Sequence, residues 1–434
     1  MMWPRVLLVG AVIIGAVASS GGPGVARPYP LDGYGYTGIR RLRGYRLMRE
    51  GKIPGHLHLV DGSLLPSAAI RLRLAGINDT LDIGPDTPRD SALQAALERV
   101  VGARDPSYRV ALLDITDPRH PRYAAIGETK GYIPGSVGKL LVMTGLFGQL
   151  RRLFPDDTAA RAALLRNTLV TADRFAVPNS HAVPVVADDW SRVIHRRVRE
   201  GDVFTLWEWV DHMASPSSNA AASMVWKETL LLQHFGRAFP ADREAEDGFL
   251  ATTPRRELSD ESIQALETPL AEAGLDTVEL RLRTYFTVGA SRVVPGKSSY
   301  ATPLELMRWM VKLEQGKLVD RWSSLEMKKL LYFTRRRYRY AASPALNEAA
   351  VYFKSGSLYR CRAEEGYSCG KYRGNALNLM HSVAIVESPA VPLPRVRQRV
   401  YLIALMSNVL RVNSAGEHLA LATAIERLIR RLHS

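Results

Sequence analysis

Ser136 and Lys139 have the types and the spacing of a nucleophile and its base. They follow the turn-forming pair Pro134 and Gly135 and stand where a mostly apolar, helix-compatible run begins. Residues three apart lie on one face of a helix, so the two side chains would point the same way. A lysine whose pKa is lowered by burial or nearby positive charge can accept the serine proton, and the positive end of the helix dipole favours the developing alkoxide.

A second candidate pair, Ser217 and Asn219, forms the only Ser-x-Asn spacing in the chain, at a break between two helical patterns that Pro216 marks. The Ser217 hydroxyl could relay a proton to a leaving group, and the Asn219 amide could hold a substrate carbonyl. The alternative is structural, because Ser217 or Ser218 would cap the following helix well.

A third candidate group, Lys354, Ser355 and Gly356, lies in the apolar segment 349–359, which reads as a strand. A lysine that faces the core there is costly unless it has a task, and it could bind a substrate carboxylate together with the Ser355 hydroxyl. Gly356 has no side chain, so a ligand could approach the strand closely. The alternative is an exposed lysine that protects an edge strand against aggregation.

The elements that must position these residues follow from hydrophobic periodicity and turn residues. Residues 86–102 favour a helix capped by Asp86 or Thr87, and residues 36–75 favour a small accessory β-unit. Further helices are expected at 205–214, 219–235, 241–274, 302–318 and 416–432, and strands at 108–116, 122–128, 349–359, 377–388 and 399–410. This order implies one sheet built from both ends of a domain, with an all-helical lobe between them.

In this order the three motifs resemble those of the penicillin-recognising serine hydrolases, the superfamily of class A β-lactamases and penicillin-binding proteins. Residues 199–226 look like the stretch that leads to the second motif of the family, and residues 300–318 look like the helix before the third. The resemblance implies an α/β (α+β) fold, in which an antiparallel sheet of about five strands is flanked by helices and joined to an all-helical lobe.

The resemblance also divides the chain. A leader and small accessory N-terminal region would take residues 19–85, and a β-lactamase-like serine hydrolase domain would take 86–434. Within that domain the sheet lobe would comprise about 86–130 and 345–434, and the helical lobe about 131–344.

The resemblance assigns roles to the first two motifs. Ser136 would be the acylated nucleophile and Lys139 its activating base. Ser217 would relay the proton to the leaving group, while Asn219 orients the substrate amide.

The third motif would hold the other end of the substrate. Lys354 and Ser355 would bind its carboxylate, and Gly356 would permit close approach. The oxyanion hole would consist of the backbone N–H groups of Ser136 and Ser357, and such preorganised donors are typically worth a few kcal/mol of barrier each.

Removal of the acyl group requires a base that activates water. Class A β-lactamases carry this base as the glutamate of a Glu-x-x-Leu-Asn loop. The nearest match is Glu279, with Leu282 in place and Arg283 where the asparagine is expected. Glu279 is therefore the deacylation candidate, and the alternative is a solvated helix face.

Three functions follow from these residues and the resemblance, none of which requires a cofactor. The leading one is an exported serine hydrolase that acylates Ser136 with a β-lactam or a peptidoglycan-type amide and hydrolyses the acyl-enzyme. The second is a D,D-peptidase, penicillin-binding protein or esterase with slow deacylation. The third is a non-catalytic cell-wall-binding protein.

The first residues have the pattern of a secretory signal peptide, residues 1–18. Arg5 precedes an uncharged apolar run, and residues 16–18 form an Ala-x-Ala cleavage site. The run is short for a membrane span, so we expect a periplasmic or secreted protein without a span after cleavage. The alternative is an uncleaved N-terminal anchor.

Cys361 and Cys369 are the only cysteines. An oxidising compartment favours a local disulfide between them, because the intervening residues are rich in turn formers. Unpaired thiols are the alternative. A metal site is not expected, since two cysteines without clustered histidines supply too few ligands. His212 and His381 lack metal-ligand spacing and are expected to be packed or surface residues.

The chain is basic, with 58 Lys+Arg against 43 Asp+Glu and a formal charge of +15. The basic residues are scattered and carry no nucleic-acid recognition motif, so nucleic acid is not the expected partner. For an exported protein the natural anionic partner is an envelope polymer or a membrane surface, and the alternative is a solvated basic face. The sequence leaves the oligomeric state open.

Overall fold

The computed structural model of the chain describes residues 32–57, 59–334 and 336–434. The expected signal peptide, residues 1–18, lies outside these residues. In the described part of the chain, no helix combines the length and the apolar surface that crossing a bilayer would need.

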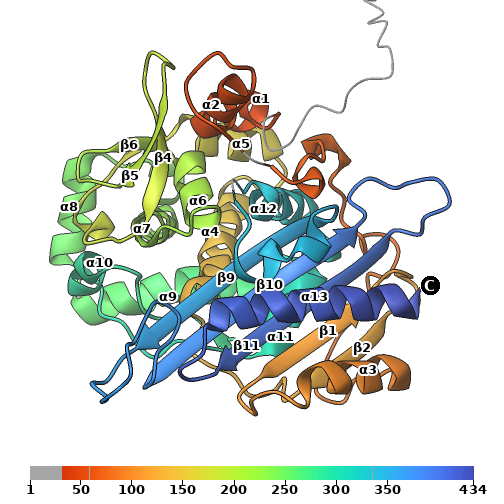
Figure 1. The fold of residues 1–434 in the computed structure, drawn as a ribbon. Coiled ribbons are helices and arrows are strands. Elements are labelled where there is room, and N and C mark those ends of the chain that lie inside the picture. Colours follow the sequence, from red (N-terminus) through yellow and green to blue (C-terminus); the bar gives the residue numbers. More distant parts are fainter. Residues whose placement is uncertain (1–31, 58, 335) are drawn as a thin grey trace, which may run out of the picture.

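A five-stranded antiparallel sheet forms the centre of the fold, with the strand order β2-β1-β11-β10-β9. Its strands are β1 (Arg109–Asp114), β2 (Arg122–Ile126), β9 (Ala350–Arg360), β10 (Leu377–Ser388) and β11 (Arg399–Asn408). The early strand β1 pairs with the late strand β11, so both ends of the domain build one sheet (Figure 1). The predicted fold class is confirmed.

Helices surround this sheet and form the second lobe. They are α1 (Tyr34–Thr37), α2 (Arg40–Arg49), α3 (Ser91–Val101), α4 (Lys139–Leu153), α5 (Thr158–Asn167), α6 (Leu206–Ala214), α7 (Asn219–Phe235), α8 (Arg243–Thr252), α9 (Arg255–Glu272), α10 (Val288–Val293), α11 (Pro303–Glu314), α12 (Arg321–Tyr332) and α13 (Ser414–Leu432). The predicted helix 241–274 is divided into α8 and α9 at Pro254, because a proline disfavours helical backbone in the residue before it.

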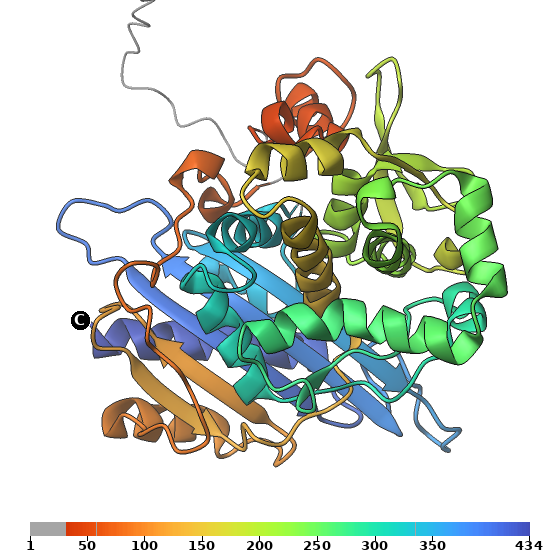
Figure 2. The same ribbon diagram turned by 180° about the vertical axis from the view of Figure 1, so that it is seen from behind.

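Both faces of the sheet are covered, because successive side chains of a strand point to opposite faces. In β11, Ile403 packs in the core beneath α3 and α13, whereas its neighbour Leu402 packs in the larger core on the other side. Figure 1 shows α13 lying across the front of the sheet, and Figure 2, the view from behind, shows α4, α11 and α12 on the opposite face. The candidate motifs lie where this larger core meets the helical lobe.

The helical lobe is organised around α4, which is buried along most of its length and packs against α7 and α9. The lobe is not purely helical, because it also contains three two-stranded ribbons. They pair β3 (Leu169–Thr171) with β6 (Val203–Thr205), β4 (Ala182–Val186) with β5 (Val193–Arg197), and β7 (Leu280–Arg281) with β8 (Tyr300–Ala301).

The cap of α3 differs from the prediction. Asp90, not Asp86 or Thr87, caps this helix, and its Oδ1 accepts a hydrogen bond from the Leu93 amide at 2.8 Å. The same carboxylate pairs with Arg122 of β2 at 2.8 Å. The cap therefore also joins the helix to the edge strand, a contact that local sequence does not reveal.

The prediction of a β-unit at 36–75 is wrong. This segment forms α2 and two short 3₁₀ turns, and the described residues 36–75 contain no strand. Arg41 and Leu42 of α2 are buried, and the Arg41 guanidinium makes two bonds of 2.5 and 2.6 Å to the buried Asp211 of α6. This buried ion pair explains how a segment with basic residues on its inner face packs as a helix.

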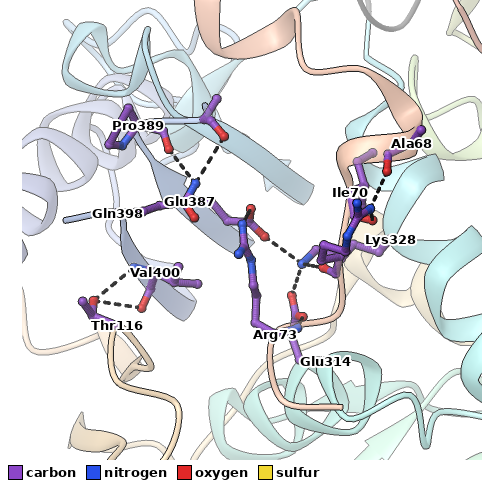
Figure 3. Close-up of polar contacts among 12 residues, drawn as sticks. Ala68, Ile70, Arg73, Thr116, Glu314, Lys328, Glu387, Pro389, Gln398 and Val400 are labelled. Atoms are coloured by element: carbon purple, nitrogen blue, oxygen red, sulfur yellow. Dashed lines mark hydrogen bonds and ion pairs between the residues drawn. The ribbon is translucent and has the colours of Figure 1, made fainter. Parts of the chain in front are cut away.

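The segment after α2 is held by a buried cluster of ions (Figure 3). Lys328 of α12 lies 2.5 Å from Glu314 and 2.8 Å from Glu387, and all three side chains are almost completely buried. Arg73 completes the cluster, because its guanidinium contacts Glu387 and its backbone N–H donates to Glu314 at 2.6 Å. Two cations thus balance two carboxylates only when the N-terminal segment is in place.

Candidate active site

Ser136 lies on a 3₁₀ turn, Gly135–Gly138, that leads directly into α4. Lys139 is the first residue of α4 and is fully buried, and its Nζ lies 3.1 Å from Ser136 Oγ. The expected juxtaposition of the two side chains is therefore present, although Ser136 precedes the α-helix and does not belong to its first turn.

Strand β9 packs closely against this turn at Gly356. A Cβ atom on Gly356 would lie 2.7 Å from the Pro134 carbonyl oxygen and 3.0 Å from the Ser136 nitrogen. Glycine is therefore needed so that the strand can approach the nucleophile turn, a role different from the ligand approach that the sequence suggested. The contact also brings Gly135 next to Ser357, so the two expected oxyanion donors belong to adjacent backbone segments.

The second motif joins the first through Lys139. The Lys139 Nζ lies 2.5 Å from the Ser217 carbonyl oxygen, 3.3 Å from Ser217 Oγ and 2.7 Å from Asn219 Oδ1. Ser218, not Ser217, caps α7, because its Oγ accepts from the Ala221 amide at 3.2 Å. Ser217 adopts a left-handed backbone conformation, with φ of 61°, and its hydroxyl is left to face the lysines.

The third motif also meets Ser217. Lys354 is buried, and its Nζ donates to Ser217 Oγ at 2.7 Å. The Ser217 hydroxyl thus lies between two lysines, one from α4 and one from β9. Residues from three distant parts of the chain share one site.

The lysines of this site have lowered pKa values. Burial, and then the charges of Lys354 and Arg339, hold the pKa of Lys139 well below its usual range. Burial and the charge of Arg339 lower the pKa of Lys354 to about 7. Lys139 can therefore exist as the free amine that a base requires, while Lys354 keeps much of its charge near neutral pH.

Comparison with known proteins identifies the family. The model of the beta-lactamase enzyme family matches residues 92–371. This chain belongs to that family. No curated protein matches it.

Two solved structures with similar folds belong to the same superfamily. One is a PBP-A mutant in an acyl-enzyme complex with penicillin G, 13% identical, with a TM-score of 0.50 over 80% of this chain and 100% of that chain. The other is the TLA-3 extended-spectrum β-lactamase, 10% identical, with a TM-score of 0.51 over 79% of this chain and 99% of that chain. At these identities the likeness concerns the fold alone.

In this member of the beta-lactamase family, Phe286 lies beside Lys139. Its ring centroid is 4.9 Å from Lys139 Nζ. Glu279 lies in the turn before β7, where its carbonyl oxygen accepts from the Thr302 amide at 3.1 Å. Within the described residues, the Glu279 carboxylate makes no hydrogen bond or ion pair with Ser136 or Lys139.

Arg339 and Tyr372 are site residues that the sequence analysis missed. The Arg339 guanidinium donates to Ser355 Oγ, to Ser357 Oγ at 2.8 Å and to the Tyr372 hydroxyl at 3.1 Å. Both residues lie in connections that carry no motif, one before β9 and one after it. The only available signal was the basic run at 334–340, which suggested surface charge.

Three histidines lie in or near this region, of which the sequence analysis named His212 and His381. His181, just before β4, has a buried Nδ1 without a hydrogen-bond partner, and burial, followed by the charge of Lys139, lowers its pKa to about 4. His212 packs edge-on against Phe204, and His381 lies in β10 with its Nε2 3.0 Å from the Ile133 carbonyl oxygen. Among these three histidines, only His181 has the charges of Lys139 and Lys354 among the causes of its lowered pKa.

The predicted disulfide between Cys361 and Cys369 is present. It closes part of the connection between β9 and β10, next to Tyr372. The described part of the chain contains no group of histidine, cysteine or acidic side chains that could hold a metal ion.

Proposed function

We propose that this protein is a serine acyl-transfer enzyme of the penicillin-binding type, which forms an ester between Ser136 and a β-lactam or a peptidoglycan-type peptide. The observation that carries the proposal is the position of Lys139 Nζ, 3.1 Å from Ser136 Oγ and within 3.3 Å of Ser217 Oγ. One buried amine thus contacts the nucleophile and the hydroxyl that would pass its proton on.

Acylation would begin with the neutral amine of Lys139. It accepts the Ser136 proton as Oγ attacks the carbonyl carbon, and the N–H groups of Ser136 and Ser357 stabilise the oxyanion. Ser217 then donates its own proton to the leaving nitrogen and is reprotonated from a neighbouring lysine. Asn219 orients the substrate amide near the base.

The charge of the site favours an anionic substrate. Lys354 and Arg339 lie close to Lys139, and neither of these two pairs with a carboxylate among the described residues. Buried cations without a counter-charge are costly, so a ligand that supplies the missing negative charge would bind well. The carboxylates of penicillins and of peptide C-termini have this charge, and the PBP-A mutant is described as an acyl-enzyme complex with penicillin G.

Slow deacylation is the second part of the proposal. The Phe286 ring lies beside Lys139, and a phenyl ring cannot accept a proton from water. The acyl-enzyme would therefore persist, which favours a penicillin-binding protein, D,D-peptidase or esterase over a β-lactamase that hydrolyses its substrate with the help of Glu279.

Labelling with a fluorescent penicillin and with a fluorophosphonate tests acylation. Both probes should label the wild-type protein and neither should label Ser136→Ala. Absence of labelling by either probe, in protein with a native circular dichroism spectrum, would favour a non-catalytic cell-wall-binding protein.

The substitution Phe286→Glu tests the slow second step. A carboxylate beside Lys139 can activate water, so we expect the penicillin adduct to decay about tenfold faster or more. Phe286→Leu is the matched control, because it changes the packing without adding a base. Equal decay of the adduct in the wild type and both variants would contradict this assignment. Glu279→Gln tests the alternative base: if the adduct decays more slowly in this variant than in the wild type, Glu279 activates the water.

We further propose that the protein is exported, with residues 1–18 as its signal peptide, and that it acts in the periplasm or outside the cell. The disulfide between Cys361 and Cys369 supports this, because disulfides persist in oxidising compartments. Mass spectrometry of the mature N-terminus checks it, and a protein that retains residues 1–18 would favour an anchor.

The net charge of the chain, +15, would attract anionic envelope polymers. Salt should then reduce the retention of the protein on purified cell wall, and retention that salt does not reduce would argue against this attraction.

A further inference from the structure

Exposed apolar side chains gather in the connection between β10 and β11, residues 389–398. Val391, Leu393 and Val396 are 52%, 53% and 43% exposed. In the part of the chain that the structure describes, no other stretch of six residues exposes three large apolar side chains. Apolar surface is driven out of water, so a group of this kind marks a place where the protein contacts another apolar phase.

The shape of this connection holds the three apolar side chains away from the sheet. The Val396 N–H donates to the Leu393 carbonyl oxygen at 3.2 Å, around a turn in which Arg395 has a φ of 62°. At the base of the connection, Gln398 Nε2 donates to the Pro389 carbonyl oxygen at 2.7 Å (Figure 3). Figures 1 and 2 show the connection, in blue, projecting beyond the sheet on the side where the C-terminus lies. The apolar group is therefore carried on a projecting turn.

The connection also carries positive charge. Arg395 and Arg397 are exposed, and residues 389–398 contain no acidic side chain. Among the described residues, neither guanidinium has an ion-pair partner. Both arginines are thus available to an anion that lies beside the apolar group.

Helix α13 adds further basic side chains at this end of the sheet. Its Glu426 carboxylate accepts from Ser388 Oγ at 3.0 Å, directly before the connection begins. One turn later the helix carries Arg430, which is 61% exposed, and the exposed Arg431. The apolar group therefore projects from a basic part of a chain whose net charge is +15.

The surface of an anionic bilayer matches both features. Its outer layer contains phosphate groups, which arginine binds through paired hydrogen bonds, and hydrocarbon lies directly beneath that layer. A soluble anionic polymer would satisfy the arginines but leave the apolar side chains in water. A second copy of the chain, docked through the same surface, would bring like charges together, which is unfavourable.

We propose that residues 391–397 form a membrane-contact loop for bilayers that contain anionic lipids. The three apolar side chains enter the boundary between head groups and acyl chains, and Arg395 and Arg397 bind lipid phosphates. Such a contact is reversible and keeps the protein at the membrane surface. It goes beyond the proposed function and does not depend on acyl transfer.

Sedimentation with lipid vesicles tests the proposal on the protein purified after export. We expect the wild type to bind vesicles that contain phosphatidylglycerol about tenfold more tightly than vesicles of phosphatidylcholine alone. The triple variant Val391→Ser/Leu393→Ser/Val396→Ser should lose about tenfold of this affinity, because it removes the apolar area that the bilayer would cover. Leu410→Ser is the matched control, since the Leu410 side chain is 40% exposed beyond the opposite end of β11.

The contribution of the arginines is tested separately. Arg395→Gln/Arg397→Gln should abolish the preference for phosphatidylglycerol. Arg243→Gln/Arg256→Gln is the matched control, because it removes the same charge from side chains of the helical lobe that are 81% and 94% exposed. Equal losses in the two double variants would mean that net charge alone attracts the protein and would overturn the proposal. So would full binding by the triple apolar variant, or a wild type that does not bind the anionic vesicles.

A fluorescent label reports insertion directly. The two native cysteines form a disulfide, so Leu393→Cys can be labelled alone with a dye that is sensitive to polarity. Its emission should shift to the blue with anionic vesicles, whereas the same dye at Leu410→Cys should not shift. An unshifted spectrum at Leu393→Cys in bound protein would overturn the proposal. A dimer in solution that the triple apolar variant separates would also overturn it, because a second copy would then cover the connection.

Acylation without vesicles separates this proposal from the proposed function. The connection follows the strand pair of Glu387 with Ala350, and Ala350 lies four residues before Lys354 in β9. The triple apolar variant should therefore react with fluorescent penicillin at the wild-type rate in solution. If the wild type is never acylated but binds vesicles as expected, the acyl-transfer function fails and the membrane contact stands. If acylation is normal and vesicle binding does not depend on the connection, only the membrane contact is wrong.

Discussion

Lys354 loses its charge close to neutral pH, because burial and the nearby Arg339 lower its pKa to about 7. Between that value and the ordinary 10.5, the unfolded chain binds a proton that the folded protein has released. The contribution of Lys354 to folding stability therefore rises with pH in this window. Its attraction for a substrate carboxylate changes in the opposite direction and declines as the pH passes about 7.

The substitution Lys354→Arg should therefore move the alkaline limb of the acylation profile. In the wild type we expect the penicillin acylation rate to fall above about pH 7, while an arginine keeps its charge over the whole measurable range. The absolute rate can be lower in the variant, since the two side chains differ in shape, so the measurement is the position of the limb. An alkaline limb near pH 7 that persists in Lys354→Arg would assign it to another group.

At the level of single residues, the sequence predicts the groups that belong to spaced motifs. Ser136, Lys139 and Lys354 could be found in this way because their types and order are distinctive. Phe286 and Arg339 could not, since an aromatic residue or an arginine in a connection has no pattern that ties it to a lysine far away in the chain.

At the level of elements, the site depends on the contact between β9 and the 3₁₀ turn that carries Ser136. Gly356 permits this contact, because any side chain there would meet the backbone of Pro134 and Ser136 at 2.7 and 3.0 Å. The turn also has a left-handed glycine, Gly135, with φ of 53°. Two elements that lie far apart in the chain thus set the spacing between the backbone N–H groups of Ser136 and Ser357, which we propose as oxyanion donors.

The substitution Gly356→Ala should slow acylation at least about tenfold, because the strand or the turn must shift and displace the oxyanion donors. Gly370→Ala is the matched control, since the nearest atom to a Cβ there is a flexible arginine carbon at 3.8 Å. Stopped-flow measurement with a chromogenic cephalosporin gives both rates. A wild-type rate in Gly356→Ala would show that this contact does not position the reacting groups.

The elements themselves followed from periodicity, and all five strands of the main sheet lie within the predicted segments to within a residue or two. The connection between α9 and α11 was harder to predict. It contains only the short β7, α10 and β8, so the sequence pattern does not show which of its residues faces Lys139. The motif spacing indicated Glu279, whereas Phe286 is the residue that lies beside Lys139.

At the level of the whole molecule, the N-terminal segment is joined by ion pairs to both the helical lobe and the sheet. Arg41 reaches Asp211 in the helical lobe, and Arg73 reaches Glu387 at the end of β10 (Figure 3). The sequence indicated a small accessory unit, because short apolar and basic runs there are mixed with glycine and proline turns. Whether its arginines are buried depends on acidic partners hundreds of residues away, which no local pattern reveals.

The substitution Arg73→Met should destabilise the protein by about 2 kcal/mol, because it leaves the buried Glu387 and Glu314 with one cation. The loss is smaller than for a fully buried pair, since the Arg73 side chain is 26% exposed. Arg71→Met is the control, because the Arg71 carbonyl oxygen that binds Lys328 belongs to the backbone and is kept. Urea unfolding measures both, and equal stability of Arg73→Met and wild type would contradict the role of the cluster.

The covalent fate of Ser136 tests the central claim most directly. Intact-mass spectrometry of the protein mixed with penicillin G, followed over time and combined with peptide mapping, reports where the adduct forms and how long it lasts. The arrangement of Lys139, Ser217 and Phe286 predicts one adduct per chain, on the peptide that contains Ser136, that persists over many minutes and is absent in Ser136→Ala. An unmodified protein, or an adduct that maps to another residue, would contradict the account.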